Sequence, residues 1–392
     1  MEGDFIKINS WLRPLSWCYG VAIGIRNMFF EMGVLKSHTF NIPIISVGNI
    51  TVGGTGKTPH VEYLIQLLKD KFNVAVLSRG YKRKKKGFII ASEQSTASDI
   101  GDEPNQIKCK YPNITVAVDK DRVHGINQLM QQSTAPDVVL LDDAFQHRYV
   151  KPGVNILLVD YHRLVIYDTL LPAGRMREPL SAKDRADIVI ITKCPKELKP
   201  MEFRVITKAM NIYPYQRLFF TTLQYKELAP VFQDARKAPD FASLKGYNIL
   251  LLTGIASPEH IIEDINLLAP DHGSLTSLAF PDHHAFNKKD IQHINETFHS
   301  MAEPRIVITT EKDAARLHMV NGLSNNVRQS IFALPIRIQF LLDQEETFNE
   351  KIIGYVRKNS RNSILVKKKD DNKSDDSNCT GDRPRTISFR NN

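Results

Sequence analysis

The sequence predicts an α/β protein with two parts, a P-loop NTPase-like α/β/α domain and a second, smaller α/β/α domain. Residues 44–47 are mostly β-branched and suit a buried strand, which leads into a glycine-rich loop and a helix-period apolar pattern. Residues 138–141 form a second buried-strand pattern, which ends in two aspartates. From about residue 218 the alternation of strand and helix patterns begins again, which indicates the second domain.

The glycine-rich loop after the first strand has the features of a phosphate-binding loop. Its glycines allow backbone N–H groups to converge on phosphate oxygens, and the N-terminus of the following helix adds a partial positive charge. Lys57 can then reach the β- and γ-phosphates, and the Thr58 hydroxyl can bind Mg²⁺. A strict Walker A motif has a glycine where this chain has Thr51, so Gly53 and Gly54 supply the flexibility.

The alternative for this loop is a glycine-rich turn that only links a strand to a helix. The strand before it and the amphipathic helix after it are the context that the motif requires, so we expect it to bind ATP or GTP. The apolar face of that helix is formed by Val61, Leu64, Ile65 and Leu68. The expected nucleotide-binding residues are Thr51, Val52, Gly53, Gly54, Thr55, Gly56, Lys57 and Thr58.

The composition is that of a globular protein with an anionic partner. The chain has 392 residues, of which 42% are hydrophobic, so it is long enough to bury the cores of two domains. Its net charge of +9 favours a phosphorylated ligand, an acidic membrane surface or nucleic acid, and the basic run 82–86 is either solvated surface or such a contact. Four widely spaced cysteines argue against a disulfide framework or a zinc site and indicate a reducing compartment. No cleavable signal peptide is expected.

Residues 12–35 form the most apolar stretch near the N-terminus. Arg26 and Glu31 interrupt this stretch, so it would make a poor transmembrane span. Arranged as a helix, it carries an apolar stripe of Cys18, Ala22, Ile25, Phe29 and Met32, with Trp11, Trp17 and Tyr19 near its start. Such a helix either lies in a membrane interface or packs on the protein core, and the residues alone leave both alternatives open.

Candidate catalytic residues follow the predicted strands. Asp142 and Asp143 end the second buried strand, where P-loop NTPases place a carboxylate that holds Mg²⁺. Arg177 lies in a proline-rich loop, where it either stabilises a transferring phosphoryl group or remains in water. Asp102 precedes a helix and on local grounds is a helix cap. His283 has a second histidine beside it, and adjacent side chains point in different directions, so a metal site is the less favoured interpretation.

Several short segments together resemble the tetraacyldisaccharide 4′-kinase family, the lipid A 4′-kinases of Gram-negative bacteria. The resemblance spans residues 43–316 in the family's order, with two small departures: Ala144 stands where a glycine is common, and a polar tail follows residue 358. The matching segments are Val47-Gly48-Asn49 through Gly53-Gly54-Thr55-Gly56-Lys57-Thr58-Pro59, Ser78-Arg79-Gly80-Tyr81, Gly101-Asp102-Glu103-Pro104, Asp142-Asp143-Ala144-Phe145-Gln146-His147, Pro172-Ala173-Gly174, Arg177-Glu178-Pro179, Asp282-His283 and Thr310-Glu311-Lys312-Asp313.

The resemblance implies transfer of the ATP γ-phosphoryl group to the 4′-hydroxyl of a tetraacylated glucosamine disaccharide 1-phosphate, which forms lipid IVA in lipid A biosynthesis. It implies ATP and Mg²⁺ as cofactors, a peripheral position at the cytoplasmic face of the inner membrane, and membrane contact by the N-terminal helix. It implies neither a nucleic acid nor an obligate protein partner. The residue roles that it implies are phosphate binding by Lys57, stabilisation of the transferring group by Arg177, Mg²⁺ binding by Thr58 with Asp142 or Asp143, and a general-base pair of Asp102 and His283.

We therefore expect four segments: an N-terminal membrane-interface helix region at 1–40, a P-loop kinase domain at 41–218, a smaller α/β domain at 219–358 and a disordered polar tail at 359–392. Two rival classes are disfavoured. A membrane-binding partitioning ATPase has a lysine before the glycine pair, where this chain has Val52. A nucleic-acid-binding ATPase would explain the positive charge, but no recognised nucleic-acid motif supports it.

Overall fold

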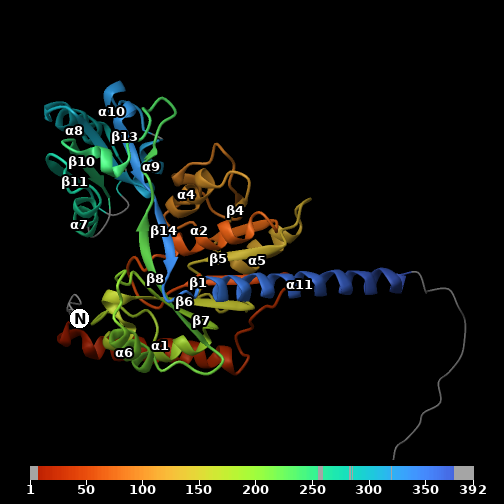
Figure 1. Ribbon diagram of the computed structural model, residues 1–392. Coiled ribbons are helices and arrows are strands. Elements are labelled where there is room, and N and C mark those ends of the chain that lie inside the picture. The colour runs from red at the N-terminus through yellow and green to blue at the C-terminus, as the bar shows by residue number, and fades with distance from the viewer. Residues whose placement is uncertain (1–7, 255–258, 282–283, 285, 319, 375–392) are drawn as a thin grey trace, which may run out of the picture.

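The computed structural model describes residues 8–254, 259–281, 284, 286–318 and 320–374 of the chain. Within these residues the chain forms a nine-stranded sheet and a five-stranded sheet, which lie in a larger and a smaller domain (Figure 1). Helices cover both sheets, so the predicted α/β class is the observed one.

The larger sheet is mostly parallel, and its central strands are buried along their whole length. This burial explains why their sequences read as continuous apolar runs rather than as alternating patterns. Only the two edge strands, β3 and β14, are antiparallel to their neighbours in the described part of the sheet. In sheet order the strands are β14 (Ile336–Phe340), β8 (Arg217–Tyr225), β7 (Ile188–Thr192), β6 (Val154–Asp160), β1 (Ile44–Gly48), β5 (Val138–Asp142), β2 (Val74–Ser78), β4 (Thr115–Val118) and β3 (Ile89–Ile90).

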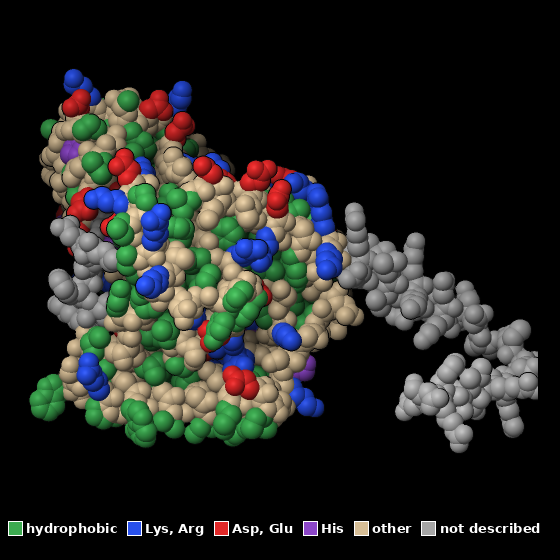
Figure 2. All heavy atoms as spheres, turned by 60° about the horizontal axis from the view of Figure 1, so that its bottom comes forward, with side chains coloured by type: hydrophobic (Ala, Val, Ile, Leu, Met, Phe, Trp, Pro, Cys, Tyr) green, Lys and Arg blue, Asp and Glu red, His purple; other side chains and the backbone are tan. Residues whose placement is uncertain are grey.

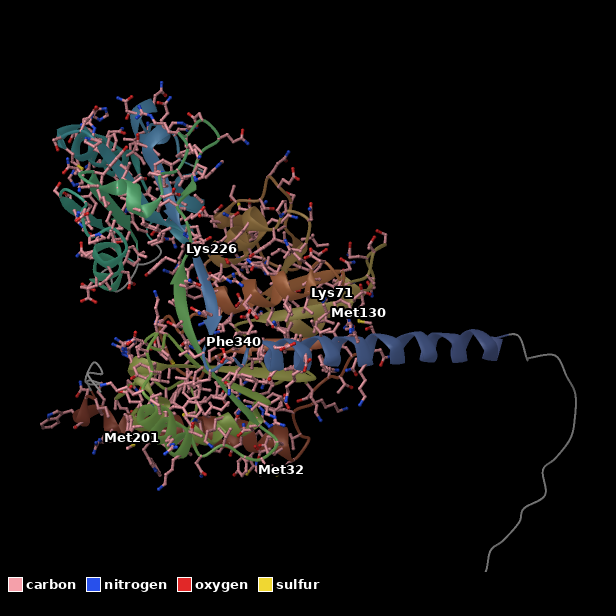
Figure 3. The ribbon with its side chains drawn as sticks, in the orientation of Figure 1. Met32, Lys71, Met130, Met201, Lys226 and Phe340 are labelled. Carbon is pink, nitrogen blue, oxygen red and sulfur yellow. The ribbon has the colours of Figure 1, made fainter. Side chains whose placement is uncertain are left out.

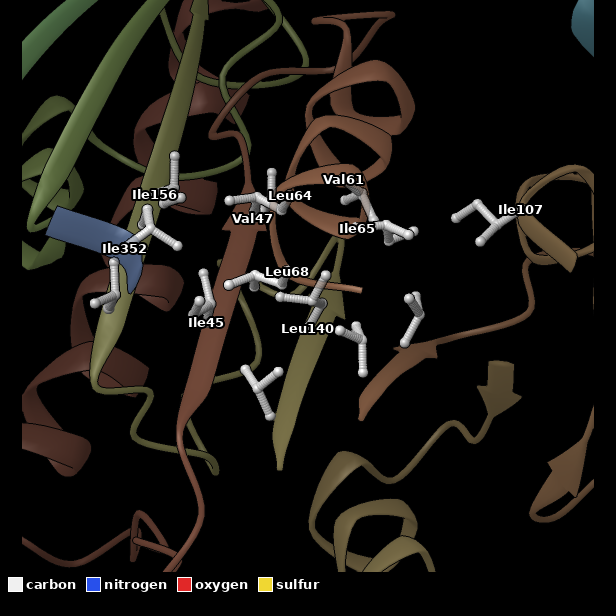
Figure 4. Close-up of a cluster of buried hydrophobic side chains, with 14 of the residues drawn as sticks. Ile45, Val47, Val61, Leu64, Ile65, Leu68, Ile107, Leu140, Ile156 and Ile352 are labelled. Atoms are coloured by element: carbon white, nitrogen blue, oxygen red, sulfur yellow. The ribbon is translucent and has the colours of Figure 1, made fainter. Parts of the chain in front are cut away.

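Helices pack on both faces of the larger sheet. One face is covered by α2 (Lys57–Leu68), α4 (Asp102–Lys110) and the first part of α11 (Glu345–Ser374), and the other by α5 (Arg122–Met130) and α6 (Pro200–Met210). The four apolar residues predicted to form one face of α2 are at most 1% exposed and pack on β1 and β5 (Figure 4). The remaining helical segments of this domain are α1 (Arg13–Glu31), α3 (Ala97–Ile100) and the 3₁₀ turns Ser10–Leu12, Tyr161–Arg163, Val165–Tyr167 and Leu180–Arg185.

The smaller domain repeats this arrangement on a reduced scale. Four of its strands are parallel, the short β9 pairs antiparallel at the edge, and separate apolar clusters fill the two faces of the sheet. In sheet order the strands are β11 (Leu275–Ala279), β10 (Asn248–Thr253), β12 (Arg305–Thr310), β13 (Ile331–Leu334) and β9 (Ala229–Pro230). The helical segments are α7 (Glu259–Leu268), α8 (Lys288–Ser300), α9 (Glu311–Leu317), α10 (Asn325–Ser330) and the 3₁₀ turn Phe241–Leu244.

A two-stranded ribbon of β8 and β14 joins the domains. The strands pair antiparallel, with Ile336 opposite Tyr225 and Phe340 opposite Thr221. Lys226, just after β8, lies at the end nearer the smaller domain, and Phe340 lies at the other end (Figure 3). The expected segment 219–358 placed this ribbon and α11 in the smaller domain, whereas they extend the larger sheet and its core. An apolar strand pattern does not specify which of two sheets the strand joins.

The C-terminal helix α11 is longer than expected. It ends at Ser374, so residues 359–374 are helical and do not form the start of a disordered tail. These residues contain neither glycine nor proline, and no local signal therefore ends the helix that begins at Glu345. Residues 375–392, the rest of the expected tail, lie outside the described residues.

Candidate active site

The glycine-rich loop connects the carboxyl end of β1 to the first residue of α2, Lys57. Gly56 caps this helix with φ +77°, and Gly53 has φ +120°; both values lie in the region that glycine tolerates best. The loop is docked against the arginine-bearing loop, because Val52 N donates to Arg175 O at 2.8 Å and Arg177 N donates to Ile50 O at 2.7 Å. The structure therefore brings the predicted phosphate loop and Arg177 together.

Polar side chains on the protein side of the phosphate loop stabilise its conformation by hydrogen bonds. Asn49 Nδ2 donates to Thr55 Oγ1 at 2.9 Å, and Gln146 Nε2 donates to Asn49 O at 2.5 Å. The Thr192 hydroxyl, at the end of β7, donates to Thr55 O at 3.1 Å. His60, one turn into α2, contacts Gly56 O and is buried, which lowers the pKa of its imidazole to about 4. Residues from β7, from α2 and from the segment after β5 therefore all form hydrogen bonds that fix the conformation of the phosphate loop.

Asp143 stands between two cations at the carboxyl end of β5. Its Oδ1 lies 3.6 Å from Lys57 Nζ, and its Oδ2 lies 3.7 Å from an Arg177 terminal nitrogen. Its backbone has φ +47°, an uncommon conformation for a non-glycine residue and one that occurs at functional sites. Three of the predicted site residues, from the start of α2, the turn after β5 and a distant loop, thus meet at the sheet edge.

Asp142 is the buried neighbour of this cluster. Its Oδ2 accepts a hydrogen bond of 3.3 Å from Ser78 Oγ, and its Oδ1 has no hydrogen-bond partner among the described residues. Burial, and next the charge of Asp143, raise the pKa of Asp142 to about 6. The charge of Glu103, on α4, also contributes to this rise.

These carboxylates fit a magnesium ion. Asp142 Oδ1 and Asp143 Oδ1 both lack a hydrogen-bond partner in the described chain, and Mg²⁺ prefers hard oxygen ligands of this kind. The described residues include no group of three or more His, Cys, Asp or Glu side chains that could hold a metal. The ion would therefore also need the Thr58 hydroxyl, phosphate oxygens and water, as Mg²⁺ at nucleotide sites usually does.

Arg122 is a buried cation beneath the two aspartates, and it was not among the predicted site residues. Its terminal nitrogens donate to Asp119 O at 2.7 Å and to Asp142 O at 3.2 Å. Burial lowers the pKa of Arg122 to about 10, and the carboxylates above it oppose that shift. Its hydrogen bond to Asp142 O fixes the backbone that presents both aspartates. The signal for it in the sequence was its position in the segment after β4, on the edge where ligands bind.

Asp102 begins α4 and joins the two domains. Gly101 is the residue that caps this helix, so Asp102 is not the cap that its local sequence suggested. Its carboxylate accepts two hydrogen bonds from Arg316 of α9, from Nε at 3.3 Å and from a terminal nitrogen at 2.7 Å. Arg316 also bonds Asp313 at 3.1 Å. The expected pairing of Asp102 with His283 remains a prediction, because His283 lies outside the described residues.

Two further ion pairs cross between α4 and α9. Lys110 Nζ lies 2.6 Å from Glu311 and also 2.5 Å from Glu62, which is on α2. Lys312 lies 3.8 Å from Glu103. The segment at residues 310–313, which is part of the family resemblance, therefore joins the smaller domain to α4 of the larger domain and, through Lys110, to α2.

A parallel sheet with a phosphate loop, two carboxylates and a cationic loop at the carboxyl ends of its strands defines a P-loop phosphotransferase.

The model of the tetraacyldisaccharide-1-P 4′-kinase family, LpxK, matches residues 8–357. A curated tetraacyldisaccharide 4′-kinase from Phocaeicola vulgatus is 56% identical to this chain, and the alignment covers 93% of this chain and 99% of the relative. A second one, from Bacteroides thetaiotaomicron, is 52% identical, and the alignment covers 93% of this chain and 97% of the relative. A crystal structure of LpxK from Aquifex aeolicus in complex with ATP, 30% identical, superposes with a TM-score of 0.69 over 88% of this chain and 98% of that one. The chain belongs to the tetraacyldisaccharide-1-P 4′-kinase family.

Proposed function

We propose that this chain uses ATP to phosphorylate the 4′-hydroxyl of a tetraacylated glucosamine disaccharide 1-phosphate, the step that forms lipid IVA in lipid A biosynthesis. The observation that carries the phosphoryl-transfer chemistry is the cluster of Lys57 and Arg177 around Asp143, next to a glycine loop and a helix N-terminus. Family membership supports the choice of acceptor.

In this proposal the cations act on the phosphates. Lys57 binds the β- and γ-phosphates, and Arg177 stabilises the negative charge that spreads over the transferring group. Thr58, Asp142 and Asp143 hold Mg²⁺, which when bound neutralises phosphate charge. The contacts of Asp143 with both cations keep the Lys57 and Arg177 side chains together at the sheet edge.

Asp102 and His283 form the base for the sugar hydroxyl in this proposal. An alcohol is a poor nucleophile until its proton is accepted in the transition state. Arg316 holds the Asp102 carboxylate through two hydrogen bonds, which fixes its orientation at the start of α4. Because Arg316 belongs to the smaller domain, the contact of the two domains completes the acceptor side of the site.

The test of this function is direct. Purified protein is incubated with ATP, Mg²⁺ and the disaccharide 1-phosphate in detergent, and the bisphosphate product is sought by mass spectrometry. A matched acceptor that lacks the free 4′-hydroxyl should give no product. Hydrolysis of ATP at the same rate with either acceptor, without a bisphosphate, would contradict the proposal.

The second part of the proposal is peripheral contact of α1 with the cytoplasmic face of the inner membrane. Among the helices of the described residues, none combines the length and the apolar composition that a membrane span requires. The predicted apolar stripe of α1 is exposed, and the flanking Trp11 and Trp17 are 93% and 71% exposed. Hydrophobic side chains gather along the lower edge of the face in Figure 2, at the end of the molecule where α1 lies in Figure 1. Met32, after α1, and Met201, on α6, mark this end in Figure 3.

Membrane contact is tested by replacing Trp11, Trp17 and Met28 with serine and measuring sedimentation with phosphatidylethanolamine–phosphatidylglycerol vesicles. We expect partition to fall at least about tenfold, since binding at the interface scales with buried apolar area. Leu267→Ser is the matched control, because Leu267 is 80% exposed on α7 of the smaller domain. Equal partition of the triple variant and the control would contradict α1 as the contact.

A further inference from the structure

His60 is a buried side chain that links the phosphate loop to the ribbon between the domains. It lies one turn into α2, and helical side chains point back toward the N-terminus, so its ring sits behind the loop. Nδ1 lies 2.7 Å from Gly56 O, and Nε2 lies 3.1 Å from Thr221 Oγ1 on β8. The residue is 4% exposed.

The two contacts define which ring nitrogen carries the hydrogen. Gly56 O can only accept, so Nδ1 must donate to it. In the neutral ring Nε2 then has only a lone pair, and the Thr221 hydroxyl donates to it. Gly56 O thus accepts from the ring as well as from the backbone N of His60, which lies 3.3 Å away.

The hydrogen bond from His60 Nδ1 to Gly56 O fixes the Gly56–Lys57 peptide group, whose N–H faces the expected nucleotide site. A peptide unit is planar, and the N–H of Lys57 points opposite to the C=O of Gly56. Holding that carbonyl toward the helix interior therefore aims the Lys57 N–H outward, into the loop. This N–H is among the first of the helix, which have no intrahelical acceptor and are free for a phosphate oxygen.

We infer that His60 is a positioning residue for ATP, which orients the Gly56–Lys57 peptide through Nδ1 and is itself held by Thr221. The inference rests on the assignment of this loop as the nucleotide site. It adds a residue that never touches the phosphates, and it makes the Nδ1 bond, not the bulk of the ring, the feature that supports binding.

Two amide substitutions separate the contacts. His60→Asn places an amide nitrogen where Nδ1 is and keeps the donor to Gly56, whereas His60→Gln reaches the Nε2 position and loses that donor. We expect the Kd for Mg²⁺–ATP, measured by equilibrium dialysis without lipid, to rise about tenfold for His60→Gln, the change that one hydrogen bond of about 1.4 kcal/mol corresponds to. His60→Asn should stay within about twofold of the original protein.

A role of His60 in packing alone predicts a different pattern. Both amide variants remove the same ring, so they would lower the melting temperature alike and bind ATP alike, and equal Kd values would overturn the inference. If His60→Gln does not fold, His60→Ala, which also lacks the donor, replaces it, and an affinity equal to that of His60→Asn has the same meaning. Unchanged ATP affinity in Lys57→Ala would instead overturn the loop assignment itself.

Discussion

Replacing Asp142 by asparagine should make the protein more stable while it abolishes turnover. The pKa of this carboxyl is raised from 3.8 to about 6, first by burial and then by the charge of Asp143. Its proton is therefore bound more tightly in the folded than in the unfolded chain. This contribution favours folding below pH 4 and is lost as the pH rises from about 4 to about 6. Above pH 6 the folded protein holds a charge that would be better solvated when unfolded.

The size of the effect follows from the shift. A change of about 2 pKa units corresponds to about 3 kcal/mol, at 1.36 kcal/mol per unit. Asparagine is neutral at every pH and can still accept from Ser78, so Asp142→Asn should raise the free energy of unfolding by up to about 3 kcal/mol at pH 8. At pH 5 the gain in the free energy of unfolding should be about half as large. At that pH the Asp142 carboxyl of the original protein is mostly protonated when folded and mostly ionised when unfolded.

The assay is urea unfolding at pH 8 and pH 5, without nucleotide or metal. Mg²⁺ with ATP serves as a control: it should raise the unfolding midpoint of the original protein and raise that of Asp142→Asn far less, because a ligand stabilises only the state that binds it. A variant that is no more stable than the original at pH 8, or whose gain is larger at pH 5, would refute the reasoning.

Three further outcomes follow from the site. Lys57→Ala should abolish turnover at unchanged melting temperature, because this lysine acts on phosphates, and activity in the folded variant would contradict the loop assignment. Arg316→Ala removes a buried cation from two carboxylates and should lower the free energy of unfolding by about 3–5 kcal/mol. Arg328→Ala, at an exposed ion pair, should lower it far less. Asp102→Ala and His283→Ala should each slow turnover ~10²–10⁴-fold, with the double variant little worse than either; multiplicative losses would show independent roles.

The sequence predicted those parts of the site that depend on local pattern and on a general property of parallel sheets. The loop before Lys57 is contiguous, so its residues, its glycines and its helix could be read directly. Asp143 could be expected near Lys57 because the carboxyl ends of parallel strands share one edge. Arg177 could be connected to them only through the family resemblance, because nothing local tells a site arginine from one in a surface loop.

Contacts between segments that are far apart in the chain could not be predicted from local sequence patterns. The pairing of Arg316 with Asp102 depends on how two domains dock, and no periodicity encodes a docking angle. His60 has the sequence signature of an ordinary residue on an amphipathic helix, and only the position of Thr221 on β8 gives its second nitrogen a partner. The placement of β14 in the larger sheet has the same origin, since a strand pattern specifies burial and not a neighbour.

The inner face of α1 gives a physical reason for a kinase with a lipid acceptor to carry an apolar helix at this position. The Tyr19 hydroxyl donates to Arg177 O at 2.9 Å, and Arg26 donates to Gln146 O at 2.8 Å. Gln146 in turn holds Asn49, at the start of the phosphate loop. The side of α1 that adjoins the exposed stripe is therefore bonded to the same loops that carry the transfer chemistry. In the proposed function, one helix thus connects the surface that contacts the membrane with the loops of the phosphoryl-transfer site, which sets the distance between them.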